Sequence, residues 1–409
     1  MRILTIASLF PNSTDSTHGI FVYQRVIHMA RLERNEAKVV APLPYFPRWL
    51  KLKRWRATAQ VPAEEEFGGL TVYHPRYFLL PKISMLWQGL SVFLRCLPRV
   101  RAIHRKWKVD CVDAHYVYPD GFAAVLLGKY LGVPVIVSAR GSDINLLPTF
   151  RGVRSMIRWT LEQAAAVVSV SSALKDVMVG LGADGNKIHV VPNGVDPARF
   201  QSISAAEARR SLGLPESGAV IVSVGSLIPS KGNELVIRAL ARMGRENART
   251  QLYILGDGPL RGFLEKLVEE LSLRDAVHFL GKRPNEELPL WFNAATVSCL
   301  ASSREGWPNV VTESLACGTP VVATRVGGVP EILHSEELGI LVEQTVDSVA
   351  DGLARALAKK WDRAAISSQT RERTWQRVAE ELESIFKAEV ARFEAGTNKS
   401  TRSGIQNAP

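Results

Sequence analysis

Two glutamates stand eight residues apart in the segment Glu305-Gly-Trp-Pro-Asn-Val-Val-Thr-Glu313. Pro308 suits the first position of a short helix that begins around Asn309, and Gly318 suits the residue beyond its end. In the first turn of that helix the backbone N–H groups of Asn309 and Val310 have no helical acceptor, so they offer a site for an anion such as a pyrophosphate.

The two carboxylates suit different parts of one ligand. Glu313 lies about one turn into the helix and can accept hydrogen bonds from two neighbouring hydroxyls of a ribose. Glu305 lies in the loop before the helix, where a sugar attached to the pyrophosphate would sit. Two glutamates at this spacing are more often just solvated side chains, so the interpretation depends on further phosphate-binding segments.

A second candidate phosphate site runs from Val224 to Gly232, where a strand leads through a loop into a helix. Lys231 can neutralise a phosphate, Ser226 lies in the loop, and the glycines let the backbone approach a ligand closely. The alternative is an ordinary turn with a surface lysine. A third segment, Gly327-Gly328-Val329-Pro330-Glu331-Ile332, opens another helix and could line the same pocket.

The elements that must position these residues follow a repeating order. Short β-branched runs alternate with helical patterns, and their near-continuous Val, Ile and Leu character indicates parallel strands buried on both faces. The series occurs twice, separated by the Pro/Gly/Asp-rich segment 192–197. We therefore predict an α/β protein of two Rossmann-like domains facing a central cleft at the carboxyl ends of their strands. The expected strands are 3–8, 38–42, 111–115, 133–139, 166–170 and 188–191, then 220–225, 251–256, 277–281, 296–300, 320–324 and 339–342.

Length and composition agree with a two-domain protein of 409 residues. The four cysteines form no C-x-x-C pair, so we expect buried thiols of a reducing compartment rather than disulfides or zinc ligands. No segment offers the roughly 20 uncharged apolar residues of a membrane span. We expect a cytoplasmic protein, bound at most peripherally to the inner face of the plasma membrane.

Positive charge is concentrated in the first half of the chain. Residues 1–200 hold 26 Lys and Arg against 14 Asp and Glu, which accounts for the whole net charge of +11. This asymmetry favours an anionic partner: nucleic acid, a phosphorylated lipid or an anionic leaflet. A nucleic-acid partner is disfavoured because no defined module interleaves aromatic and basic residues.

One apolar stripe at helical spacing lies in the same half. We expect it to pack on the sheet, although the basic residues 95–108 that follow suit a membrane surface. The stripe consists of Ile83, Leu86, Trp87, Leu90, Phe93, Leu94 and Leu97.

Together the motifs resemble one known family, the retaining glycosyltransferase family four with the GT-B fold, of the bacterial cell-surface polysaccharide type. Two segments of the first half, Ser138-Ala-Arg-Gly-Ser-Asp143 and Val191-Pro-Asn-Gly-Val-Asp196, extend the resemblance over most of the chain. The motifs that carry it are Gly225…Lys231-Gly232, Gly256-Asp257-Gly258-Pro259, Glu305-x7-Glu313 and Gly327-Gly328-x-Pro330-Glu331.

The resemblance implies a domain organisation. Residues 1–198 would form an acceptor-binding domain and residues 199–371 a nucleotide-sugar-binding domain. A helix over 372–393 would return to the N-terminal domain, and the composition of residues 394–409 predicts a disordered tail.

The resemblance also implies roles. Glu313 would hold the donor ribose, Lys231 the pyrophosphate and Glu305 the transferred sugar, while Gly19 would lie near acceptor and phosphate in the loop after the first strand. His115 ends a strand and is a candidate catalytic residue, the alternative being a satisfied histidine at a sheet edge.

Two positions depart from the family pattern, which usually has Arg at Ser226 and commonly has His at Arg140. A guanidinium can form a bidentate pair with a carboxylate or phosphate. Arg140 therefore predicts a donor or acceptor that bears an acid, such as a uronic acid sugar. The alternative is that Arg140 pairs with Asp143 or a facing acidic residue and holds its loop.

The implied reaction is transfer of a sugar, with retention, from a nucleotide-diphosphate sugar to a glycan or polyprenyl-linked acceptor. No cofactor or metal is expected, because a helix amino terminus and Lys231 can stabilise the departing diphosphate. The alternatives are a nucleotide-sugar epimerase and a non-catalytic nucleotide-sugar-binding protein of the same fold.

Overall fold

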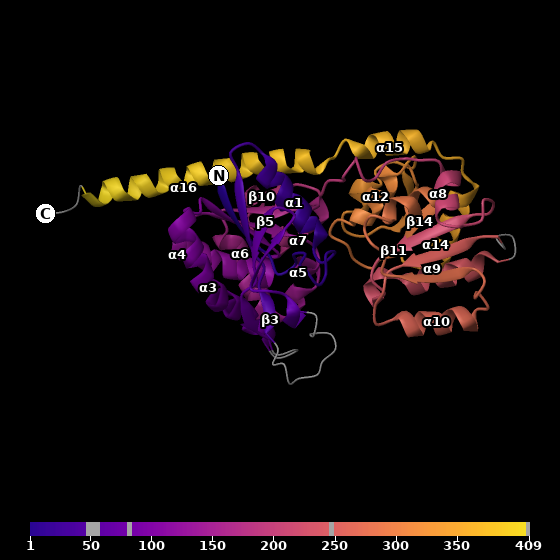
Figure 1. Ribbon diagram of the computed structural model, residues 1–409, viewed down its shortest axis with the longest axis horizontal. Helices are drawn as coiled ribbons and strands as arrows, with labels where there is room; N and C mark the ends of the chain where they lie inside the picture. Colours follow the sequence, from indigo (N-terminus) through magenta and orange to yellow (C-terminus); the bar gives the residue numbers. More distant parts are fainter. Residues whose placement is uncertain (46–57, 80–83, 245–248, 406–409) are drawn as a thin grey trace. The chain divides into compact units, whose positions relative to one another are not determined.

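A computed structural model describes residues 1–45, 58–79, 84–244 and 249–405 (Figure 1). The chain forms two units, one of Met1–Pro192 with the helix from Trp375 onward, the other of Asn193–Thr374. The chain first passes from one unit to the other after Pro192, six residues before the expected domain boundary at 198. The intervening segment belongs to the second unit because Val195 pairs with Thr374 and Arg371 donates a hydrogen bond to the Pro197 carbonyl at 3.0 Å.

The first unit is built on an eight-stranded sheet of order β10-β9-β8-β7-β1-β2-β5-β4. All pairs are parallel except β4 with β5 at one edge. Every expected strand of this half is present, and the central strands β7 and β8 are fully buried. The strands are β1 (Arg2–Ile6), β2 (Glu36–Val40), β4 (Glu64–Phe67), β5 (Leu70–Tyr73), β7 (Cys111–His115), β8 (Val135–Ala139), β9 (Ala166–Ser169) and β10 (Ile188–Val190).

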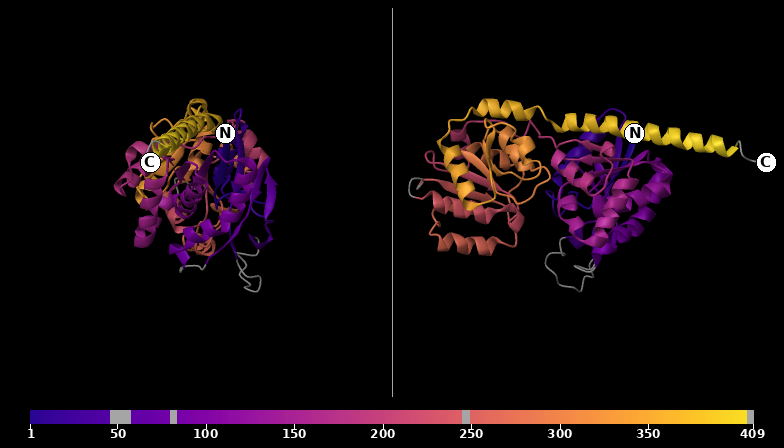
Figure 2. Two further views of the ribbon diagram at one scale, coloured as in Figure 1. Left: turned by 90° about the vertical axis from the view of Figure 1, so that its left-hand side faces the viewer. Right: turned by 180° about the vertical axis from the view of Figure 1, so that it is seen from behind.

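Helices cover both faces of this sheet (Figures 1 and 2). On one face α16 (Trp375–Ile405) lies against α1 (Ile20–Arg31), and its Trp375, Leu382 and Phe386 pack among buried side chains of β1, β7, β8 and β9. This confirms the C-terminal helix that returns to the first domain. The other helices include α3 (Gln88–Trp107), α4 (Phe122–Leu131), α6 (Arg151–Gln163) and α7 (Ser172–Gly180).

The helix α16 continues to Ile405, beyond the expected end at 393 and into the expected disordered tail. No proline interrupts residues 394–405. Each residue added to an existing helix gains one backbone hydrogen bond without a new nucleation cost, so polar composition alone does not end the helix there.

The second unit is built on a six-stranded parallel sheet of order β13-β12-β11-β14-β15-β16. In order of appearance this is 3-2-1-4-5-6, the doubly wound arrangement of dinucleotide-binding domains. The two faces are packed by separate apolar clusters, one beneath α9 (Asn233–Met243) and α14 (Val346–Ala358), the other beneath α11 (Leu288–Ala294) and α12 (Asn309–Ala316). The strands are β11 (Val220–Val224), β12 (Gln251–Leu255), β13 (Val277–Gly281), β14 (Val297–Leu300), β15 (Val321–Thr324) and β16 (Gly339–Val342).

The apolar stripe of the first half does not pack on the sheet as expected. Its Leu86, Trp87, Leu90 and Leu94 are exposed, Phe93 and Leu97 are partly buried, and Ile83 lies outside the described residues. The face of α3 that is buried instead consists of Gly89, Val92, Cys96, Val100 and Ile103. Within the described part of the chain, no helix is long and apolar enough to cross a bilayer.

Candidate functional site

In the second unit the sequence-predicted loops meet where the strand order reverses, between β11 and β14. Ligands of open α/β sheets bind at the carboxyl ends of the strands at this position. Lys231, in the turn that follows β11, places its Nζ 2.6 Å from Glu305 Oε1, in the loop after β14. The Ser302 hydroxyl donates to the same carboxylate oxygen at 2.7 Å. Two predicted site residues are thus in direct contact at the switch point.

Two glycines allow these loops to approach. A Cβ at Gly232 would lie 2.0 Å from the carbonyl oxygen of Ala301, and one at Gly327 would lie 2.0 Å from that of Glu305. Both glycines have positive φ, 66° and 51°, a conformation that costs other L-residues about 1–2 kcal/mol. The chain after β15 therefore packs against the backbone of Glu305 at a distance that only glycine permits.

The expected helix after Glu305 is α12, which begins at Asn309 with Pro308 as its N-cap rather than its first residue. Asn309 and Val310 lie in the first turn, whose backbone N–H groups have no acceptor within the helix. The Asn309 side chain accepts a hydrogen bond from Asn193 at 2.9 Å, which fixes the start of the helix. Ser226 is exposed in the loop after β11.

Glu313 lies one turn further along α12 and is partly buried. Desolvation raises the pKa of its carboxyl to about 7, and the nearby Arg199 opposes this shift. At neutral pH the carboxyl is therefore only partly ionised. Hydrogen-bond donors placed against it would favour the ionised form and lower the pKa again.

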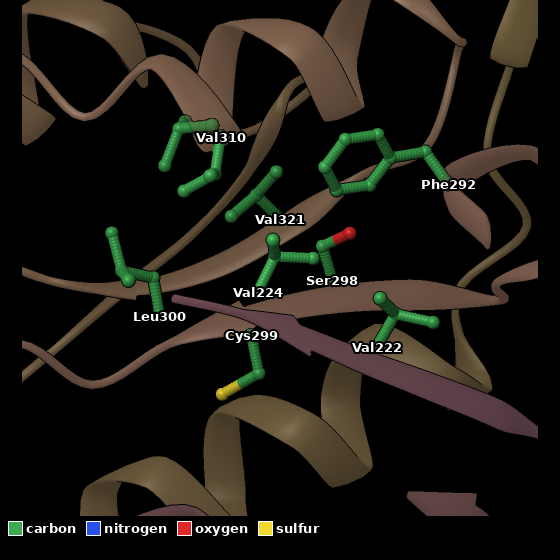
Figure 3. Close-up of a pocket in the computed structure, with 9 residues that line it drawn as sticks. Val222, Val224, Phe292, Ser298, Cys299, Leu300, Val310 and Val321 are labelled. Atoms are coloured by element: carbon green, nitrogen blue, oxygen red, sulfur yellow. The ribbon is translucent and has the colours of Figure 1, made fainter. Parts of the chain in front are cut away.

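A small cavity lies beneath the same helix, with a volume of about 10 Å³. Figure 3 shows Val310 and Phe292 on its helical side, and Val222, Val224 and Val321 among the side chains that reach it from the strands. This volume holds about one water molecule, so the cavity is a packing gap under α12 rather than a ligand pocket.

The first unit has its own switch point, between β1 and β7. Gly19 lies in the loop after β1 with φ 66°, and a Cβ there would lie 2.4 Å from the Leu9 carbonyl oxygen. Asp120, which follows β7, accepts hydrogen bonds from Ser8, which follows β1. The Ser8 backbone N–H donates at 2.7 Å and its hydroxyl at 2.5 Å. Burial raises the pKa of Asp120 to about 7, although both hydrogen bonds oppose this shift.

Beside it lies a buried cluster of charged side chains at the ends of β7 and β8. His115 Nε2 is 3.0 Å from Asp113 Oδ2, and an Arg140 Nη nitrogen is 2.6 Å from His115 Nδ1. Because a guanidinium only donates, Nδ1 accepts and Nε2 carries the proton that it donates to Asp113. Burial lowers the pKa of His115 to about 3, so the imidazole is neutral. Both of its nitrogens are hydrogen-bonded, one to Asp113 and one to Arg140.

Arg25 of α1 completes this cluster. It donates to the Ser138 hydroxyl at 2.7 Å and pairs with Asp113 at 3.2 Å. Burial alone would raise the pKa of Asp113, but Arg25, His115 and Arg140 together lower it below its ordinary value. Burial and the neighbouring Arg25 lower the pKa of Arg140 to about 9, so Arg140 stays charged at neutral pH.

Asp143 holds the loop that carries Arg140 through backbone hydrogen bonds. Asp143 accepts hydrogen bonds from the backbone N–H groups of Val117, Arg140 and Gly141. The Arg140 side chain contacts His115, and its guanidinium carbon lies 5.4 Å from the centre of the Phe21 ring. Asp143 thus shapes the loop through the backbone and leaves the guanidinium directed at the His115 cluster.

Comparison with known proteins identifies the family. Residues 204–373 match the family model of glycosyl transferases group 1, and residues 55–199 match that of glycosyltransferase family 4. The chain is 33% identical over 367 residues to a D-inositol 3-phosphate glycosyltransferase of Saccharomonospora viridis, covering 83% of this chain and 84% of that one. The chain is a family 4 glycosyltransferase. It is also 26% identical over 404 residues to TuaC of Bacillus subtilis, named as a teichuronic acid biosynthesis glycosyltransferase, with 97% and 96% covered.

Solved structures show that this glycosyltransferase has the GT-B fold. It matches sucrose-phosphate synthase from Thermosynechococcus elongatus with a TM-score of 0.79 and 21% identity, over 96% of this chain and all of that one. It matches Anabaena Alr3699/HepE, solved in complex with UDP, with a TM-score of 0.72 and 18% identity, over 95% and 100%.

Sequence reasoning did not single out Arg25, Asp113 or Asp120 of this glycosyltransferase. One signal was available for Arg25, which stands among the buried positions Val22, Val26 and Met29 of α1. A basic residue at the helical spacing of an apolar face predicts a buried acidic partner. No local pattern connects Ser8 with Asp120, because their contact arises from the pairing of β1 with β7.

Proposed function

We propose that this glycosyltransferase transfers a sugar, with retention, from a nucleotide-diphosphate sugar to a glycan or lipid-linked acceptor in cell-surface polysaccharide biosynthesis. The observation that carries the donor half of this proposal is the Lys231–Glu305 contact at the switch point of the second unit, beside the start of α12. A cation and a helix amino terminus at that position suit a diphosphate.

The donor would bind with its groups distributed over three elements. Its diphosphate would take hydrogen bonds from the backbone N–H groups of Asn309 and Val310 and the charge of Lys231. Its ribose hydroxyls would donate to Glu313, and the sugar to be transferred would lie at Glu305. Because Glu305 already neutralises Lys231, an arriving diphosphate would compete for that ammonium and release the carboxylate toward the sugar.

In the proposed step the bond between the sugar C1 and the diphosphate oxygen breaks, and its electron pair goes to the departing diphosphate. A bond from the acceptor hydroxyl oxygen to C1 forms on the same face. The hydroxyl proton passes to the departing phosphate oxygen. Lys231 and the α12 amino terminus stabilise the charge that develops there, and no side chain forms a covalent intermediate.

The first unit would bind the acceptor, and its buried cluster suggests that the acceptor bears an acid. Two guanidinium groups lie in it, those of Arg25 and Arg140, and the carboxyls of Asp113 and Asp143 both act electrostatically on Arg140. The relatives named for teichuronic acid biosynthesis and for D-inositol 3-phosphate both point to acidic compounds. In this proposal His115 positions Arg140, since both of its nitrogens are already occupied.

The test of donor binding is a thermal-shift screen of the full-length protein against UDP-, GDP- and ADP-sugars. A bound ligand stabilises the folded protein by about 2.7 kcal/mol at a hundred times its dissociation constant. We expect one nucleotide class to raise the melting temperature, and Lys231→Met to remove most of that rise. The matched control is Lys266→Met, which removes an exposed lysine of α10 (Arg261–Glu270).

Two results would reject this proposal. Absence of stabilisation by every nucleotide sugar would reject the donor site. Epimerised donor in the absence of acceptor would instead assign an isomerase. Product analysis with a purified acceptor, in which nucleoside diphosphate and glycosylated acceptor form in equal amounts, separates transfer from both outcomes.

A further inference from the structure

Exposed apolar side chains gather at the start of α3 in the first unit. Trp87 at its N-cap is 68% exposed, Leu94 is 55%, Leu86 is 45% and Leu90 is 38%. We call these four residues the α3 tip. Monomeric soluble proteins seldom expose contiguous apolar side chains in this way without a partner or a surface to bind.

Neighbouring elements extend the α3 tip. A Cβ at Gly152 would lie 2.3 Å from a Leu86 methyl carbon, so Leu86 rests on the first turn of α6, directly after the exposed Phe150. The Ser91 hydroxyl donates to the carbonyl of the exposed Phe78 at 3.1 Å. The apolar surface therefore draws on three separate segments of the first unit.

The core does not require this surface, because α3 has a second apolar face that serves it. Val92, Cys96 and Val100 form the buried face at helical spacing. Trp87, Leu90 and Leu94 follow one another at intervals of three and four residues and therefore share a different side of the helix. Among the residues that the structure describes, that side remains exposed.

Basic residues continue the same line. Arg101 and Arg105 follow Leu94 by seven and eleven residues and are exposed, as is Arg151 at the start of α6. The helix α3 contains no Asp or Glu, and among the described residues no carboxylate pairs with Arg101 or Arg105. By contrast, Arg99 on another side of α3 is 3.6 Å from Glu64.

We propose that the α3 tip inserts into the headgroup region of an anionic phospholipid bilayer, with Arg101, Arg105 and Arg151 against the lipid phosphates. An apolar patch that carries a tryptophan and is flanked by unpaired cations has the composition of an interfacial helix. A second copy of the chain is a poorer occupant, because a self-complementary contact would bring the same arginines together.

This inference rests on the proposed function in one respect, since a lipid-linked acceptor supplies the reason for docking. The binding itself is independent of the donor site and can be measured without any sugar. The full-length protein is sedimented with vesicles of phosphatidylcholine alone and of phosphatidylcholine mixed with phosphatidylglycerol, at low and high salt. We expect binding only to the anionic vesicles, weakened by salt.

Two variants separate the apolar and basic contributions. The double variant Trp87→Ser/Leu90→Ser should weaken vesicle binding by more than about tenfold, because each side chain loses its apolar burial. The variant Arg101→Ala/Arg105→Ala should weaken it by roughly fivefold for each arginine. The matched controls are Phe263→Ser and Arg210→Ala, which change an exposed aromatic residue and an exposed arginine of the second unit and should bind as the wild type does.

Several results would overturn the inference. They are absence of binding to anionic vesicles, unchanged binding of the Trp87→Ser/Leu90→Ser variant, or a dimer in sedimentation equilibrium that this variant dissociates. Because Trp87 and Leu90 are exposed, the circular dichroism spectrum and melting temperature of the variant should match the wild type. The rise in melting temperature with nucleotide sugar is measured in parallel. It should be absent only if the donor proposal is wrong, and loss of membrane docking should leave it unchanged.

Discussion

Replacing Glu313 by glutamine tests the second unit through stability and binding at once. Burial raises the pKa of the Glu313 carboxyl from its ordinary value of 4.5 to about 7. Such a carboxyl favours the folded state only while it is protonated. Its contribution is fully present below pH 4.5 and is lost as the pH rises to about 7. The ionised carboxylate then destabilises the fold by up to about 3 kcal/mol, at about 1.4 kcal/mol for each pH unit.

Glutamine keeps the shape and cannot ionise, so Glu313→Gln should be more stable than the wild type by up to about 3 kcal/mol at pH 8. At pH 5 the difference should be below about 1 kcal/mol. The assay is urea denaturation of both proteins at the two pH values. The matched control is Glu270→Gln on α10, whose carboxylate is exposed and should leave the free energy of unfolding unchanged at both.

The same substitution should weaken donor binding. An ionised carboxylate accepts two hydroxyl hydrogen bonds, and hydrogen bonds to a charged group contribute about 1.5–3 kcal/mol, so the affinity of Glu313→Gln should fall roughly tenfold or more at pH 8. In the wild type, affinity should decline as the pH falls below about 7. Equal stability of the two proteins at pH 8 would refute the raised pKa. Undiminished nucleotide-sugar affinity in the variant would refute the ribose contact.

Three further predictions concern the remaining site residues. Glu305→Gln should lower turnover at least roughly tenfold without weakening donor binding, because Glu305 is assigned to the transferred sugar and competes with the diphosphate for Lys231. Equal small effects in single-turnover and binding measurements would reject that assignment. Gly327→Ala should lower both activity and the free energy of unfolding by more than Gly213→Ala does. Both glycines have positive φ, but only a Cβ at Gly327 would clash with a backbone oxygen. Equal losses of stability in urea denaturation would show that backbone strain alone matters. Arg140→Met should abolish activity toward acid-bearing acceptors with a small change in melting temperature, whereas Arg25→Met should cost about 3–5 kcal/mol of stability by removing the ion-pair partner of the buried Asp113 carboxylate. A wild-type enzyme that glycosylates only neutral acceptors would end the acidic-acceptor proposal.

The sequence predicts the two sheets well, because their strands are continuous runs of β-branched residues buried on both faces. It does not predict the edge of the first sheet. Strand β4 begins with Glu64-Glu65-Glu66, and this run of carboxylates, of which Glu64 and Glu66 are exposed, gives it the character of a loop. Charged side chains on an edge strand limit pairing with other chains. The run of apolar β-branched residues that identifies a central strand is therefore missing from this edge strand.

The helix α3 illustrates a different limit. Its sequence places apolar residues on two sides, and periodicity alone does not decide which side meets the sheet. The expected stripe includes Leu90 and Leu94, whereas the buried side uses the smaller Val92 and Cys96. Small side chains allow a helix to lie closer to a sheet, so packing geometry rather than total hydrophobicity decides the orientation.

In the second unit, residue types and spacing single out Lys231 and Glu305 as parts of one site, and the structure brings them into contact because both follow strands of one parallel sheet. The first unit resists the same approach. Its cluster joins Arg25 of a helix with Asp113 and Arg140 at the ends of two strands, and no local sequence pattern connects these three positions.

The two units would be stabilised by ligands of opposite electrostatic character. In the second, burial keeps the Glu313 carboxyl partly protonated, and hydroxyl donors would stabilise its ionised form. In the first, burial acts against the charge of Arg140, and an anion would stabilise it. Each unit therefore carries a buried group whose charged form is costly in the protein alone. Such departures from the rules of stable cores are concentrated at functional sites. In the proposed function, a hydroxyl-rich nucleotide would relieve this cost in one unit and an acid-bearing acceptor would relieve it in the other.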